Sequence, residues 1–97
     1  MKFDDSYLLL EDLYADKSVP KKQTDQVKSQ LGQIIARLEQ GCRDAAKLQP
    51  SFDKLTDTVN GFGWEDAAEA VAADVLYILE WFDVDLDVED ALRRRNW

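Results

Sequence analysis

The sequence contains no histidine, one cysteine, two prolines and four glycines among its 97 residues. Without histidine the chain cannot form a Ser–His or Cys–His nucleophilic pair, and it cannot bind a metal through imidazole. The single cysteine, Cys42, excludes a disulfide within the chain, which is consistent with a reducing cytoplasm. Gly61 and Gly63 lie close together, but no lysine follows them as a phosphate-binding loop requires. These absences remove most of the common catalytic arrangements.

Lysine and arginine are absent from residues 55–92, which carry eleven acidic residues, and the whole chain has a net charge of −8. Such a surface repels phosphate groups, so we expect neither a nucleic acid nor an anionic membrane as a partner. The apolar runs are too short to cross a bilayer, and the opening Met-Lys-Phe-Asp-Asp has acids where a signal peptide needs an apolar stretch. We therefore expect a cytoplasmic protein, and a basic protein is the natural complement to its charge.

Apolar residues recur at the spacing of a helix in two long stretches. The first stretch carries a stripe of seven residues: Val27, Leu31, Ile34, Ile35, Leu38, Cys42 and Ala45. This pattern predicts a helix that ends before Pro50 and buries Cys42. The second stretch predicts a helix from about Trp64 to Phe82 with a core line of six residues: Trp64, Ala68, Val71, Val75, Ile78 and Phe82.

Shorter helices are predicted around these two. Asp4–Ser6 are typical N-cap residues, and a helix after them would carry an apolar face made of Tyr7, Leu10, Leu13 and Tyr14. Pro50 and Ser51 predict the start of a third helix, which Gly61 and Gly63 end. A last helix is expected near Asp87, after an extended connection. The chain is therefore predicted to be all-α: one domain over residues 1–97, a compact bundle of four main helices with a short C-terminal helix.

The three arginines and the tryptophan at residues 93–97 have two interpretations. Glu89 and Arg93, like Asp90 and Arg94, are four residues apart, and such pairs stabilise a helix by about 0.2–0.5 kcal/mol each. On this interpretation the arginines close the last helix, and Trp97 folds back onto the domain. The other interpretation is a contact with a second chain, because arginine and tryptophan are frequent in binding interfaces.

Two stretches resemble a family of small bacterial proteins of unknown function. The opening resembles this family in seven residues: Leu13, Tyr14, Asp16, Pro20, Asp25, Val27 and Lys28. The end is similar as well, since the family closes on Arg-x-Trp as Arg95 and Trp97 do here. An aromatic residue expected between Asp16 and Pro20 is replaced, with Ser18 in that place. The resemblance implies an all-helical bacterial cytoplasmic protein, and it carries no activity.

The carboxylates do not follow a complete metal-binding pattern. Asp83, Asp85 and Asp87 match the first ligands of a calcium loop, but Val88 and Arg94 occupy the positions that need glycine and glutamate. We therefore expect no calcium, no other metal and no cofactor.

A small magnesium-dependent hydrolase of a phosphate compound is the alternative function. Asp66 with Glu69, and Glu80 with Asp83, have the three-residue spacing found in helical pyrophosphohydrolases, but both pairs lie on one helix. Glu69 and Glu80 are about 16 Å apart along that helix, so one ion cannot bind both. An acidic residue of the first helix would have to complete such a site, and Glu11 and Asp12 are the candidates.

The acids of the fourth predicted helix share one face with an apolar residue, Leu76. Such a face is either ordinary solvated surface or a docking surface for a basic protein. We favour docking, which makes the chain a non-enzymatic protein-binding module, with an immunity or inhibitor role as its most concrete form. The predicted partner-binding residues are Glu65, Asp66, Glu69, Leu76, Tyr77, Glu80, Asp83 and Trp97.

Overall fold

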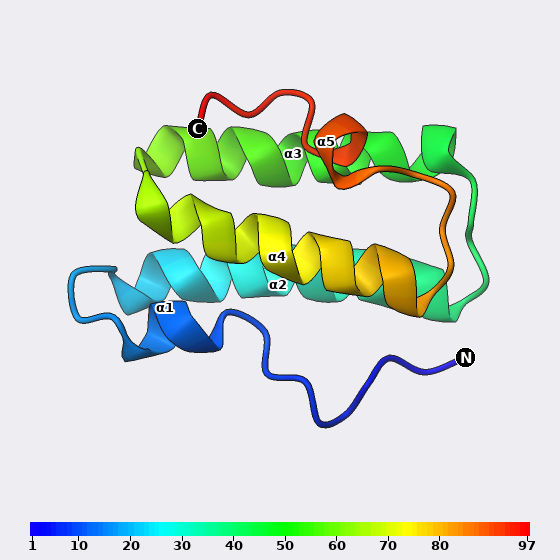
Figure 1. Cartoon of the computed structure of the whole chain (residues 1–97), viewed down its shortest axis with the longest axis horizontal. Helices are drawn as coiled ribbons and strands as arrows, with labels where there is room; N and C mark the ends of the chain where they lie inside the picture. The colour runs from blue at the N-terminus through cyan, green and yellow to red at the C-terminus, as the bar shows by residue number, and fades with distance from the viewer.

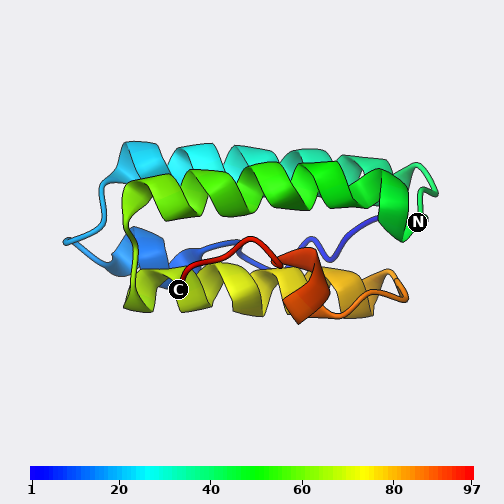
Figure 2. The ribbon, with the colours of Figure 1, turned by 90° about the horizontal axis from the view of Figure 1, so that it is seen from above.

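The computed structural model describes all residues 1–97 and consists of two layers of helices (Figures 1 and 2). The five helices are α1 (Glu11–Ala15), α2 (Lys21–Glu39), α3 (Ala45–Phe62), α4 (Asp66–Trp81) and α5 (Val88–Ala91). Helices α2 and α3 pack side by side in one layer. Helix α4 lies in the other layer, between the N-terminal segment with α1 and the C-terminal segment with α5. The prediction of an all-α bundle with a short C-terminal helix is confirmed.

The core lies between the layers, where the apolar stripes of α2 and α4 meet α3. Six residues predicted to be buried are each at most 1% exposed: Leu31, Ile34, Leu38, Val71, Val75 and Ile78. Helix α3 adds Phe52, Leu55 and Val59, which are completely buried. Helix α4 contacts both α1 and α5, so apolar residues are needed on more than one side of it. None of the five helices combines the length and the apolar character needed to cross a membrane.

The first helix starts later than the sequence suggests. Asp4 does not begin a helix; its carboxylate accepts hydrogen bonds from the backbone N–H and the hydroxyl of Ser6 and closes a local turn. Leu10 has φ 57°, in the left-handed region, and α1 begins directly after it at Glu11. Residues 1–10, called the N-terminal arm below, therefore have no regular secondary structure.

The boundary between the second and third helices was also predicted wrongly. Helix α2 ends at Glu39, because Gly41 adopts φ 99° and turns the chain. Asp44 then caps α3 by accepting the N–H of Ala46. Pro50 lies inside α3, where it removes one helical hydrogen bond without ending the helix. Cys42 consequently lies in the turn and is only partly buried, so its predicted place on the buried stripe is wrong.

The C-terminal arginines follow α5 and do not pair within it. Arg93 forms an ion pair of 2.7 Å with Asp53 of α3, and Arg94 one of 3.0 Å with Asp57. The predicted pairs within the last helix are wrong, because α5 has only four residues and ends at Ala91. These ion pairs hold the C-terminal segment against α3.

Candidate functional site

The outward face of α4 occupies the centre of one side of the molecule (Figure 1). Glu65, Asp66, Glu69, Glu80 and Asp83 are all exposed, as their positions on one side of the helix predicted. Leu76 lies among them and is 45% exposed, one of four large apolar residues on the surface. An exposed leucine surrounded by acids is the feature from which the partner-binding face was predicted.

The structure divides the eight predicted residues among three places. Leu76, Glu80 and Asp83 line a groove at the C-terminal end of α4. A separate hollow at the other end of α4 is lined by four of the others: Glu65, Asp66, Glu69 and Trp97. Tyr77 lies apart from both, where α4 contacts the N-terminal arm. The predicted partner-binding residues therefore lie on two separate surfaces, and Tyr77 lies at the contact with the N-terminal arm.

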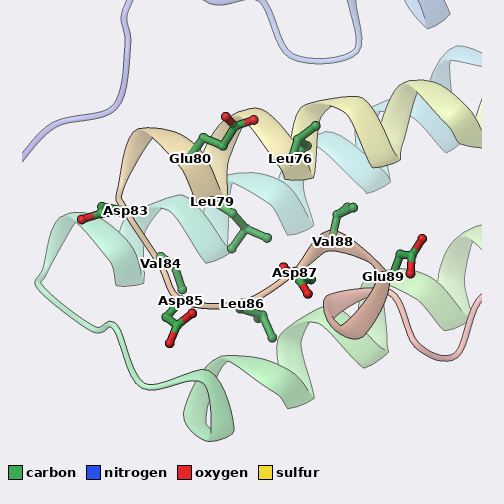
Figure 3. Close-up of a pocket in the computed structure, with 10 residues that line it drawn as sticks. All are labelled: Leu76, Leu79, Glu80, Asp83, Val84, Asp85, Leu86, Asp87, Val88 and Glu89. Carbon is green, nitrogen blue, oxygen red and sulfur yellow. The ribbon is translucent and has the colours of Figure 1, made fainter.

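The groove lies between α4 and the segment of residues 83–89, and it has a volume of about 440 Å³ (Figure 3). Its apolar lining consists of Leu76, Leu79, Val84, Leu86 and Val88. Its acidic lining consists of Glu80, Asp83, Asp85, Asp87 and Glu89. Leu79 points from α4 toward the segment, whereas Glu80 and Asp83 point outward from the rim. The site thus combines an apolar floor with a rim of one charge.

No cation of the chain forms an ion pair with this rim, although Arg43 donates to the backbone carbonyl of Phe82, next to Asp83. The two ion pairs of the molecule use Asp53 and Asp57 of α3, which lie outside the groove. Arg95, the remaining arginine of the C-terminal segment, donates to the backbone carbonyls of Glu89 and Leu92. The five carboxylates of the groove accept no hydrogen bond from any other side chain or backbone group of the protein, so they are free to bind a ligand.

The backbone of the groove also offers unused acceptors. The carbonyl oxygens of Asp85 and Leu86 accept no hydrogen bond within the protein, whereas those of Val84 and Asp87 bond to the N–H groups of Leu86 and Ala91. The N–H groups of Asp85, Asp87, Val88 and Glu89 likewise find no acceptor within the protein, so the acceptor character of the groove comes from its five carboxylates.

Two acids at the N-terminal arm, Asp74 and Asp4, are arranged differently, because each has an internal partner. The hydroxyl of Tyr7 donates to Asp74 at 2.5 Å, and the hydroxyl of Tyr77 donates to Asp4 at 2.6 Å. The rings of Tyr7 and Tyr77 stack with their centroids 4.0 Å apart. The indole N–H of Trp81 donates to the backbone carbonyl of Lys2. Tyr77 and Trp81 thus hold the arm in place.

Asp74 is the only acidic residue that is buried, with 6% of its surface exposed. Its second oxygen accepts the backbone N–H of Leu10 at 2.7 Å. Burial raises the pKa of the Asp74 carboxyl, and the hydrogen bonds from Tyr7 and Leu10 offset only part of that effect. Burial and the bond to Asp74 also raise the pKa of Tyr7. Asp74 therefore connects the arm to α4.

Trp97 lies beside the hollow at the N-terminal end of α4. Trp97 packs against the core, which confirms that it folds back onto the domain. Asn60 of α3 supports this segment by donating to the carbonyl of Arg94 and accepting the N–H of Asn96. The hollow beside Trp97 is lined by only two apolar residues, so it lacks the apolar floor of the groove.

No three acidic or cysteine side chains lie close enough together to hold a metal ion. Glu11 and Asp12, the candidates to complete a magnesium site, lie next to Asp74 rather than beside Glu69 or Glu80. The pairs of carboxylates on α4 therefore receive no ligand from a second helix.

The prediction of site residues missed most of the groove. Asp85, Asp87 and Glu89 supply three of its five acids, yet the sequence patterns indicated only an incomplete calcium loop for the two aspartates and a helical ion pair for Glu89. The alternation of acidic and apolar residues over 83–88 was the available signal. In an extended segment such alternation sends the two kinds of side chain to opposite sides, so one kind can form a floor and the other a rim.

The fold and the groove define a small all-helical protein with an acidic, apolar-floored groove on one face. The chain belongs to DUF5713, a family of unknown function, whose model matches residues 3–97. No curated protein and no solved structure matches the chain.

Proposed function

We propose that this protein is a non-enzymatic protein-binding module that docks a basic partner on the outward face of α4. The observation that supports this best is the groove at the C-terminal end of α4, with five acids that form no ion pair within the chain. Exposed Leu76 at its edge is suited to act as an apolar anchor. The rest of the acidic face would speed the encounter with a basic partner through its electrostatic field.

An inhibitor or immunity role is the most concrete form of this proposal. A basic enzyme such as a nuclease exposes cationic side chains around its active site, and a compact acidic protein can cover them. We place the protein in the cytoplasm of a bacterium, where its single thiol would remain reduced. The hydrolase alternative receives no support, because the carboxylates of α4 gain no partner from a second helix.

The experiment is to capture partners from the native cell and then measure binding kinetics with variants of α4. We expect Glu69→Gln combined with Glu80→Gln to slow association, and the effect to shrink at high salt. Leu76→Ala should mainly speed dissociation, because it removes an apolar anchor.

A matched control separates the local face from the overall charge. Gln26→Lys combined with Gln33→Lys changes the net charge by the same two units, but on the exposed side of α2. If this control slows association as much as the α4 variant, the partner responds to net charge alone. Wild-type kinetics for all three variants would refute the proposal.

A further inference from the structure

The groove has room for one or two long side chains of a partner. Its volume of about 440 Å³ lies between α4 and the segment of residues 83–89 (Figure 3). Leu79 and Val84 contribute apolar surface at the base, and the carboxylates of Glu80 and Asp83 lie at the edge. A ligand that fits must therefore be apolar along its length and cationic at its end.

Lysine and arginine have this form, because their methylene chains pack on apolar surface while the charged ends reach polar groups. The polar groups of the groove favour arginine. The side chains of its five acidic residues are all acceptors. A guanidinium has five donors and no acceptor, and it binds carboxylates through two parallel hydrogen bonds. It is also less strongly hydrated than an ammonium group, so it leaves water more easily.

The three C-terminal arginines do not occupy the groove, although they follow it directly in the sequence. Arg93 and Arg94 pair with α3, and Arg95 donates to backbone carbonyls. A second copy of this acidic chain would bring further negative charge to the same place. Charge complementarity therefore points to a segment of a different, basic protein.

We propose that the groove binds an arginine side chain of the partner, with an apolar neighbour of that arginine covering Leu76. This inference rests on the proposed function and names the group that the partner presents. The guanidinium lies at the rim beside Asp85 and Asp87, and the methylene chain lies on Leu79 and Val84. A lysine in the same position forms fewer directed hydrogen bonds and binds more weakly.

The test uses the full-length protein, labelled with ¹⁵N, and three capped peptides of sequence Leu-X-Leu. X is arginine, lysine, or citrulline, which has nearly the shape of arginine but no charge. With the arginine peptide we expect saturable shifts of the backbone amides of Leu79, Val84, Asp85 and Asp87. The lysine peptide should bind several-fold more weakly, and the citrulline peptide about tenfold more weakly. Equal binding of the arginine and citrulline peptides would overturn the inference.

Two variants with the same change of charge locate the site. Asp85→Asn combined with Asp87→Asn removes two charges from the groove and should weaken the arginine peptide about tenfold. Glu65→Gln combined with Glu69→Gln removes two charges from the other end of α4 and should change binding less than about twofold. Equal effects of the two variants, or no shifts in the groove up to about 10 mM peptide, would overturn the inference.

The two proposals can fail separately. If the captured partner depends on Glu69 and Glu80 while the arginine peptide does not bind the groove, the docking function stands and the inference about arginine is wrong. If the peptide binds as expected but the captured partner ignores every α4 variant, the groove recognises arginine and the proposed docking function is wrong.

Discussion

The two sides of α4 carry the same type of residue but use it differently. Toward the N-terminal arm, Asp74 and Asp4 accept hydrogen bonds from Tyr7 and Tyr77, so each carboxylate serves the fold. Toward the C-terminal segment, the five acids of the groove have no partner within the protein. The comparison teaches that acidic residues available to bind another molecule are identified by missing internal partners rather than by their number.

The largest effect on stability should come from the core beneath both sides. Leu38 is completely buried on α2, and Leu38→Ala should reduce the free energy of unfolding by about 2–5 kcal/mol through lost apolar contact and a cavity. Urea denaturation followed by circular dichroism measures this. A loss below about 0.5 kcal/mol, which is usual for surface positions, would show that the buried face of α2 is misplaced.

A smaller loss of stability is expected from a change in the N-terminal arm, and a smaller one still from a change in the groove. Tyr7→Phe removes a donor from buried Asp74 and should cost about 1–3 kcal/mol, because the carboxylate is then left partly unsatisfied. Tyr14→Phe is the matched control, because Tyr14 donates to Asp25 in a similar pair at the surface. That change, like Asp85→Asn with Asp87→Asn in the groove, should cost about 0.5 kcal/mol or less. If all three variants lose the same free energy of unfolding, the carboxylate at the arm is no more important for the fold than those of the groove.

The smallest effect is a difference in pH dependence between two aspartates. The folded-state pKa of Asp74 is raised above 3.8 by burial, so its contribution to stability is full below pH 3.8 and is lost as the pH rises through the raised value. The hydrogen bond from Arg93 lowers the pKa of Asp53, so its contribution is present above pH 3.8 and is lost as the pH falls through the lowered value.

Unfolding free energies of the wild type, Asp74→Asn and Asp53→Asn at about pH 7, 5 and 3 test these signs. As the pH falls from neutral, the wild type should gain stability relative to Asp74→Asn. Relative to Asp53→Asn, it should lose stability at the acid end of the range. Effects that the three proteins share cancel in these differences. The same slope for both pairs would show that Asp74 is not more costly to ionise in the folded protein.

Hydrophobic periodicity predicted α2 and α4 well, because each buries a continuous stripe whose spacing is visible in the sequence. Local signals were less reliable at the ends of helices. Asp4 has the side chain of a helix cap, but it binds Ser6 and Tyr77 instead. Pro50 suggested a helix start, but Asp44 supplies a cap six residues earlier and α3 continues through the proline. Such choices depend on competing partners that helix propensities do not describe.

The sequence by itself determined the all-helical class, the buried faces of α2 and α4 and the acidic outer face of α4, because these follow from residue type and the geometry of one helix. Only the tertiary structure decided which acids have partners. Tyr7 and Asp74 are 67 residues apart in the chain, and Arg93 and Asp53 are 40 apart, yet each pair is in contact. The groove likewise needs the segment of residues 83–89 to fold back beside α4. Contacts between distant residues arise only when the helices pack, and packing leaves the five groove acids without a partner.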